Sequence, residues 1–169
     1  MKIQNILFCL AISFLFLRCQ QKSDNLQNKE KDLEKDYFPN GQLKTLTHVN
    51  NKERNGPTIF FDSNGFINAI NIFRKDVVDG EVFDFYTDGV LKQKTIVRNG
   101  VMDGYSYSFY PNGSIASFRK WVKGKKEGFS EDYWENTMIK AVYFSRNDTL
   151  IFERLFDSLG YVIETKGVP

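Results

Sequence analysis

Hydrophobic and polar residues alternate along residues 104–128 in the pattern of a β-hairpin. Aromatic residues alternate with serines over residues 105–109, and a period of two is typical of a half-buried strand. Residues 110–113, Tyr-Pro-Asn-Gly, predict a turn, because proline presets φ and glycine accepts a positive φ. Apolar residues resume over residues 115–121 and predict the return strand.

The same pattern recurs every 24 residues along most of the chain. The glycines predicted to occupy the turns are Gly41, Gly65, Gly89, Gly113 and, in a shorter last unit, Gly160. Boundary glycines follow the same 24-residue spacing at Gly56, Gly80, Gly104 and Gly128. Asn or Asp precedes each of the first four turn glycines, and Leu or Ile stands two residues after each. Registers that agree at one period indicate a repeat protein.

The repeat predicts an all-β fold. A single hairpin is marginal in water, so we expect the hairpins to stack edge to edge. The result is an antiparallel meander of tandem 24-residue β-hairpin repeats, forming one elongated twisted sheet of about 10 to 12 strands. The predicted units are residues 36–56, 56–80, 80–104, 104–128, 128–151 and 151–166. Thr137 replaces the turn glycine of the fifth unit, which we interpret as a different turn.

Residues 1–18 have the features of a signal peptide. Lys2 precedes an apolar run of 12 residues, shorter than the roughly 20 that span a membrane. Residues 16–19, Phe-Leu-Arg-Cys, resemble a bacterial lipobox, which predicts lipidation of Cys19, although Arg18 stands where a small residue is usual. A plain signal peptide or an uncleaved anchor is the alternative. The polar composition of residues 19–35 predicts a solvated tether before a domain at residues 36–166.

Charge and cysteine content exclude several functions. The net charge of +2 comes from Lys2 and Arg18, and the remaining 21 basic residues balance 21 acidic ones. A nucleic-acid-binding protein shows a basic excess or stripe, so we expect no nucleic-acid partner. Cys9 lies in the predicted leader and Cys19 would carry the lipid, so packing without a disulfide must hold the domain.

Candidate catalytic residues are few. His48 is the only histidine and falls in a predicted strand, so neither a metal cluster nor a nucleophile–histidine pair can be assembled. Glu131 and Asp132 are adjacent, so in a strand their carboxylates point to opposite faces, although a distant acid such as Asp84 could pair with one of them. We therefore predict no catalytic residue, no metal and no cofactor.

The aromatic residues leave two interpretations open. Tyr86, Tyr110 and Trp134 occupy one register in consecutive units, and Phe85, Phe109 and Tyr133 point the other way. Such ladders commonly staple adjacent hairpins together. Alternatively, the ladder of Tyr86, Tyr110 and Trp134 is exposed and binds a protein partner, a glycan or a lipid headgroup.

The turn sequences resemble a known repeat. Residues 109–115 and 37–44 follow an aromatic-aromatic-x-Asn-Gly-x-aliphatic pattern, and residues 124–128 and 100–104 carry the linking glycine pair. These motifs are similar to the variant MORN (membrane occupation and recognition nexus) repeat, in the bacterial form often labelled antitoxin-like. The resemblance covers the chain after the tether and implies an all-β repeat sheet, usually without catalysis.

Together these features predict a membrane-anchored, non-enzymatic repeat module that binds or scaffolds at the bacterial cell envelope. The expected partners are a membrane, through the lipid anchor, and a protein, with a glycan or lipid headgroup as a further possibility. The expected location is the outer membrane or cell surface, after export. The alternatives are an antitoxin or immunity-type protein that neutralises a toxin, and an envelope hydrolase that uses surface carboxylates.

Overall fold

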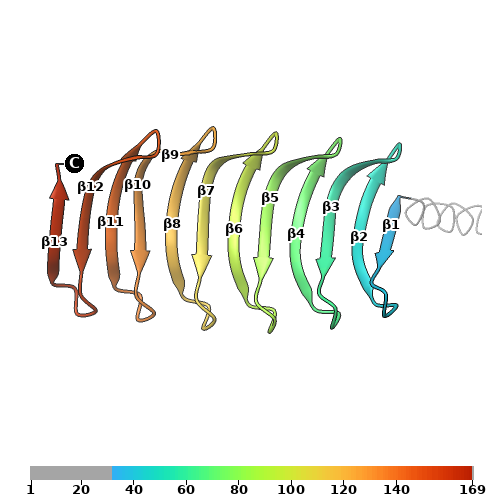
Figure 1. Cartoon of the computed structure of the whole chain (residues 1–169), viewed down its shortest axis with the longest axis horizontal. Coiled ribbons are helices and arrows are strands. Elements are labelled where there is room, and N and C mark those ends of the chain that lie inside the picture. Colours follow the sequence, from blue (N-terminus) through green and yellow to red (C-terminus); the bar gives the residue numbers. More distant parts are fainter. Residues whose placement is uncertain (1–31, 169) are drawn as a thin grey trace, which may run out of the picture. The chain divides into compact units, whose positions relative to one another are not determined.

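The structure is a computed structural model that describes residues 32–168, and every regular element in this range is a β-strand (Figure 1). The strands are β1 (Leu33–Tyr37), β2 (Leu43–Asn50), β3 (Glu53–Phe61), β4 (Ile67–Arg74), β5 (Val77–Phe85), β6 (Leu91–Arg98), β7 (Val101–Phe109), β8 (Ile115–Val122), β9 (Lys125–Lys126), β10 (Gly128–Tyr133), β11 (Ile139–Arg146), β12 (Thr149–Phe156) and β13 (Val162–Gly167). The predicted all-β class is confirmed.

The strands form one antiparallel meander. Each pairs with its neighbours in sequence, except that the two-residue β9 lies beside β8 and leaves β8 to pair with β10 (Figure 1). The predicted sheet of tandem hairpins is therefore confirmed, with β1 and β13 as its edges. Residues 33–35, assigned to the tether from the sequence, lie in β1. The predicted signal peptide, Cys19 and the tether up to residue 31 lie outside the described residues.

The turns that carry the regularly spaced glycines share one geometry. The five turn glycines have φ between 81° and 91°, a region that side-chain-bearing residues rarely adopt. The N–H of Gly113 donates to the carbonyl of Tyr110 at 2.8 Å, and the same bond closes the other turns. The Asn112 side chain accepts a hydrogen bond from the N–H of Ser114 at 2.9 Å, as expected for an Asx turn.

Thr137 corrects one prediction. The turn of the fifth unit is the same as the others, because Thr137 has φ of 69° and its N–H donates to the carbonyl of Trp134 at 2.8 Å. Asn136 accepts from the N–H of Met138 at 3.1 Å, as Asn112 does from Ser114. The surrounding hydrogen bonds therefore hold a β-branched residue in a conformation that suits glycine.

The opposite ends of the hairpins are two-residue turns in which both residues have positive φ. This is the type I′ geometry, which matches the twist of the flanking strands. The pairs are Asn51–Lys52, Lys75–Asp76, Asn99–Gly100, Lys123–Gly124 and Asn147–Asp148. In the last four turns the second residue donates its N–H to a carbonyl of the preceding unit, for example Gly124 to Met102 at 2.8 Å. Successive units are thus joined at their turns as well as along their strands.

The boundary glycines sit where the chain leaves space for a large neighbour. Gly80 and Gly104 have φ of 152° and 140°, and a Cβ on either would lie 2.7 Å and 2.9 Å from the Cβ of Ile72 and Ile96, respectively. On the strand that follows, a large side chain stands opposite each glycine. The pairs are Gly56 with Phe73, Gly80 with Val97, and Gly104 with Trp121.

The sheet is a single layer, so its core is thin. Four apolar side chains are buried among the described residues: Val49, Phe73, Ala141 and Phe152. Small hydroxyl residues make up the buried polar set: Thr47, Thr58, Thr95, Ser106, Ser130 and Ser145. Cross-strand pairs such as Thr47 with Thr58 and Thr95 with Ser106 place the first four on one face, which we call the hydroxyl face. Ser130 pairs with Tyr143 two residues from Ser145, so these serines share one face as well.

Candidate functional site

The predicted binding ladder joins each unit to the next. The Tyr86 hydroxyl donates to the carbonyl of Phe109 at 2.8 Å, and the Tyr110 hydroxyl donates to that of Tyr133 at 2.7 Å. Trp134 Nε1 reaches the carbonyl of Phe156 at 3.4 Å. All three side chains are half-buried. This geometry matches the stapling interpretation, and a role of the ladder in binding stays a prediction.

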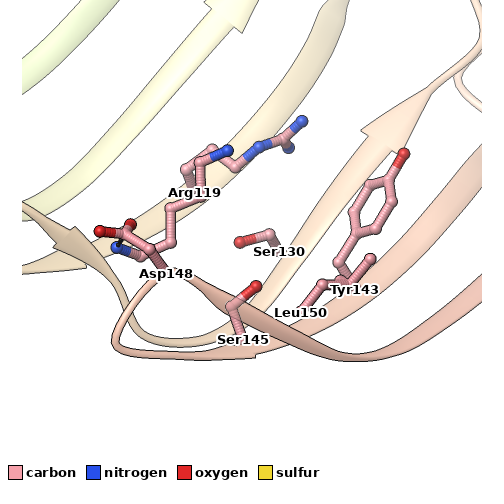
Figure 2. A pocket seen from close by; sticks show the side chains of 7 residues that line it. Arg119, Ser130, Tyr143, Ser145, Asp148 and Leu150 are labelled. Carbon is pink, nitrogen blue, oxygen red and sulfur yellow. Dashed lines mark hydrogen bonds between the residues drawn. The ribbon is translucent and has the colours of Figure 1, made fainter. Parts of the chain in front are cut away.

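A pocket of about 310 Å³ opens on the sheet at β8 to β12. Its volume falls at the lower end of the roughly 300–1,000 Å³ typical of ligand pockets. It is lined by Arg119, Lys126, Ser130, Tyr143, Ser145, Asp148 and Leu150. Figure 2 shows the side chains of Ser130 and Ser145 between Asp148 on one side and Tyr143 on the other. We call this space the Ser145 pocket.

The repeat explains why the pocket exists. Ser145 stands opposite the boundary glycine Gly128, as Trp121 stands opposite Gly104. The residues at this register in the four preceding units are all large and apolar: Val49, Phe73, Val97 and Trp121. In the fifth unit neither the glycine nor the serine fills the space, so the Ser145 pocket lies where the fourth unit holds an indole.

Arg119, which lines the pocket, forms an ion pair with Asp132. The Arg119 guanidinium donates to the Asp132 carboxylate and to the backbone carbonyls of Phe118 and Glu131. Both charged side chains are about three-quarters buried, with exposed fractions of 22% and 24%. The Tyr143 hydroxyl donates to the other Asp132 oxygen at 3.0 Å. Both charged groups therefore have several hydrogen-bond partners, which fix the guanidinium in place.

The two tyrosines near this pair have raised pKa values. Burial, together with the negative charge of Asp132 and the hydrogen bond to it, raises the pKa of Tyr143 to about 12. Burial and the hydrogen bond to Glu131 raise the pKa of Tyr133 to about 12. Both hydroxyls therefore stay protonated at neutral pH and act as hydrogen-bond donors. Glu131 and Asp132 therefore accept hydrogen bonds from different tyrosines.

The other predicted candidates contribute less. His48 is half-buried, and its Nδ1 lies 3.1 Å from the carbonyl of Pro57. Within residues 32–168 no group of three or more His, Cys, Asp or Glu residues could hold a metal ion. A helix with the length and apolarity needed to cross a membrane is absent from the same residues.

These features define a class of protein, a single-layer sheet of tandem β-hairpin repeats. Residues 33–51 and 78–99 match the family model of the MORN repeat variant, which confirms the resemblance seen in the sequence for these segments. MORN repeats suggest a repeat module for binding. No curated protein matches the chain.

One similar solved structure is the "Crystal structure of accessory secretory protein 1,2 and 3 in Streptococcus pneumoniae". The sequence identity is 20% and the TM-score is 0.27. The match covers 68% of this chain and 19% of that chain, so this chain spans about a fifth of its length.

The sequence analysis missed the Ser145 pocket and the contacts of Arg119 with Asp132. The pocket carried a readable signal, since a serine interrupts four large apolar residues at one register. The ion pair carried none, because its two residues are 13 positions apart and meet only through the pairing of β8 with β10.

Proposed function

We propose that the chain is a lipid-anchored, non-enzymatic repeat module that binds a protein partner at the bacterial cell envelope through its C-terminal units. The leader pattern and Cys19 support the anchor, and the match to the MORN repeat variant supports a binding module. The observation that carries the proposal is the distribution of exposed apolar side chains.

Exposed large apolar residues are concentrated near the C-terminal end of the described chain. Seventeen such residues are found in residues 32–168, and ten of these are at position 129 or later. The ten are Phe129, Met138, Ile139, Leu150, Ile151, Leu159, Tyr161, Val162, Ile163 and Val168. A concentration of apolar surface is typical of a protein–protein contact, where buried aromatic and aliphatic anchors supply most of the affinity.

Phe129 and Phe66 provide a matched pair of variants to test this surface. Both are phenylalanines with similar exposed fractions, 52% and 56%, but only Phe129 lies in the C-terminal units. The match is in exposure only: Phe129 also packs on Phe144, with 5.0 Å between the ring centroids, so Phe129→Ser should lower stability more than Phe66→Ser, and the melting temperature of each variant is measured beside the crosslink. We expect a protein crosslinked to the full chain in intact cells to be lost with Phe129→Ser and retained with Phe66→Ser. Equal retention in both variants, or equal loss, would refute a C-terminal binding surface.

The anchor is tested separately with Cys19→Ser. Two or three acyl chains, at about 0.8 kcal/mol per buried CH₂, give stable membrane binding. The variant should therefore lose fatty-acid labelling and move from the membrane fraction to the soluble fraction. Labelling that survives the substitution would exclude Cys19 as the lipid site.

A further inference from the structure

We infer that the Ser145 pocket binds a tryptophan side chain of the partner, in the position that Trp121 occupies in the preceding unit. This inference rests on the proposed function and names the anchor that the partner supplies. Trp121 in the preceding unit shows how an indole packs at this register.

The first argument is the equivalence of the two positions. Trp121 and Ser145 are 24 residues apart, and each stands opposite a boundary glycine, Gly104 and Gly128. The glycine at position 128 is retained, while the side chain opposite it is reduced from an indole to a hydroxymethyl group. An indole entering from outside would therefore stand opposite Gly128, as Trp121 stands opposite Gly104.

The second argument is a hydrogen-bond acceptor in the right place. Trp121 Nε1 donates to the hydroxyl oxygen of Ser106 at 2.8 Å. Ser130 is the equivalent of Ser106, 24 residues later, and it also lines the Ser145 pocket. Ser130 is 3% exposed, and its hydroxyl would accept a hydrogen bond from an indole N–H as that of Ser106 does.

The third argument is the set of side chains that flank the ring. Arg54 of the first unit lies over the ring of Phe73 in the second, with 4.1 Å between its guanidinium carbon and the ring centroid. In the fourth unit Lys126 Nζ lies 6.0 Å from the ring centroid of Trp121. The Ser145 pocket is lined by Lys126 and Leu150. Lys126 stands at the same sequence distance from Ser145 as Arg54 does from Phe73, and Leu150 at the same distance from Ser145 as Lys126 does from Trp121. A cation and an aliphatic side chain are both favourable neighbours for an indole face.

Tryptophan is the residue that this set of contacts favours. A phenylalanine ring would fill the space but leave the Ser130 hydroxyl without a donor, and a lysine would meet Arg119 and Lys126. The charge of Arg119 is balanced by Asp132, so the pocket is not an open anion site.

The probe for the experiment is N-acetyl-5-fluorotryptophanamide, followed by ¹⁹F NMR with the full chain in lipid nanodiscs and with empty nanodiscs as blank. We expect saturable binding with a dissociation constant near ~1 mM, which is the affinity of a fragment of this size. Ser145→Trp fills the pocket from within, so it should weaken binding at least tenfold and leave the melting temperature unchanged or higher. Val122→Trp adds a tryptophan at an exposed position beside Trp121 and should leave binding unchanged.

Ser130→Ala tests the acceptor. It should weaken binding of the tryptophan probe about fivefold, the loss expected for one hydrogen bond of about 1 kcal/mol. Binding of the corresponding fluorophenylalanine amide should be the same in Ser130→Ala and in the unmodified chain. Equal loss for both probes would overturn the contact with Ser130.

Three further outcomes would overturn the inference. The first is no saturable binding up to about 10 mM probe, which is well above the dissociation constant expected for such a fragment. The second is unchanged binding in Ser145→Trp, and the third is unfolding of Ser145→Trp, because a space shaped for indole must accept one. Ser145→Val, which copies Val49 and Val97, gives the same test with a smaller side chain. If the probe binds but Ser145→Trp still crosslinks the partner in cells, the pocket is not the partner's anchor. If no partner crosslinks to the unmodified chain while the probe binds, the proposed function fails and the pocket remains.

Discussion

Thr137→Gly should stabilise the protein, although most substitutions of ordered residues destabilise. Thr137 has φ of 69°, while the five glycines of the equivalent turns have φ between 81° and 91°. A residue with a Cβ in this region costs about 1–2 kcal/mol, and the cost is highest for β-branched residues. Glycine removes this cost but gains about 0.4–1 kcal/mol of entropy in the unfolded chain. The net gain in the free energy of unfolding should be about 0.5–1 kcal/mol.

The assay is urea and thermal denaturation of the variant and the unmodified chain. For a domain of this size the gain corresponds to a rise in melting temperature of about 2–5 °C. Repeat arrays can unfold unit by unit, so amide hydrogen exchange in β10 and β11 gives the local measure. Amides of these two strands should exchange more slowly in Thr137→Gly, and those of β2 and β3 should be unchanged.

Gly113→Thr is the reciprocal control. A Cβ at Gly113 would have no atom within 4 Å, so its cost comes from the backbone conformation alone. We expect a loss of about 1–2 kcal/mol. If Gly113→Thr shows this loss while Thr137→Gly is neutral or destabilising, Thr137 is not strained and the equivalence of the two turns is wrong.

Three other predictions follow from the same structure. Gly80→Ala should cost more than Gly113→Ala, about 3 against about 1 kcal/mol, because its Cβ would lie 2.7 Å from that of Ile72, and Ile72→Ala should recover part of the difference in a double-mutant cycle. Tyr110→Phe should cost about 1 kcal/mol in urea denaturation through loss of the bond to the Tyr133 carbonyl, while Tyr110→Ala should cost more; equal costs would show that the hydroxyl carries the whole effect. The raised pKa values of Tyr133 and Tyr143, about 12 each, mean that the folded chain holds these protons more tightly than the unfolded chain, whose tyrosines titrate near about 10. Through these groups, the free energy of unfolding should therefore not change with pH below ~10 and should fall between pH ~10 and 12. Tyr143→Phe should reduce the slope of this fall in denaturation titrations.

The repeat and its turns could be predicted from the sequence because they depend on local chemistry. A turn that needs a positive φ favours glycine, so glycines at a fixed spacing predict such turns at that spacing, and the structure places all five turn glycines in that region. Thr137 shows the limit of this reasoning. Its own preference argues against the turn, but the hydrogen bonds that Trp134 and Asn136 make with Thr137 and Met138 impose it.

The contacts across the sheet were harder to predict, because bulges change which residues share a face. The register shifts between Thr95 and Val97 in one pairing, and between Ser108 and Phe109 in the next. A shift of one residue moves a side chain to the other face, so sequence distance alone cannot place Arg119 beside Asp132. Alignment of the units by their glycines avoids this problem. The shift recurs at one register in the pairings of β2 with β3, β4 with β5 and β6 with β7, and where it differs, in β11 with β12, Ser145 still pairs with Leu150 as Trp121 pairs with Lys126. That alignment places Ser145 at the register of Trp121.

Departures from the repeat are the most informative positions in a chain of this kind. Successive units are joined by the same turn-to-turn hydrogen bonds at their type I′ ends, so the side chains in the middle of each strand are free to differ. Ser145 lacks the packing that the larger side chains at this register provide in the other units, which are Val49, Phe73, Val97 and Trp121. No side chain of its own unit occupies the space. Thr137 adds backbone strain in the same unit. A loss of packing in the C-terminal units is what a binding site there requires, since a pocket filled by the chain's own side chain cannot accept a partner's. We therefore expect the units whose residues fit the repeat best to tolerate substitution at the hydroxyl face with effects on stability alone, and the fifth unit to be where substitution changes binding.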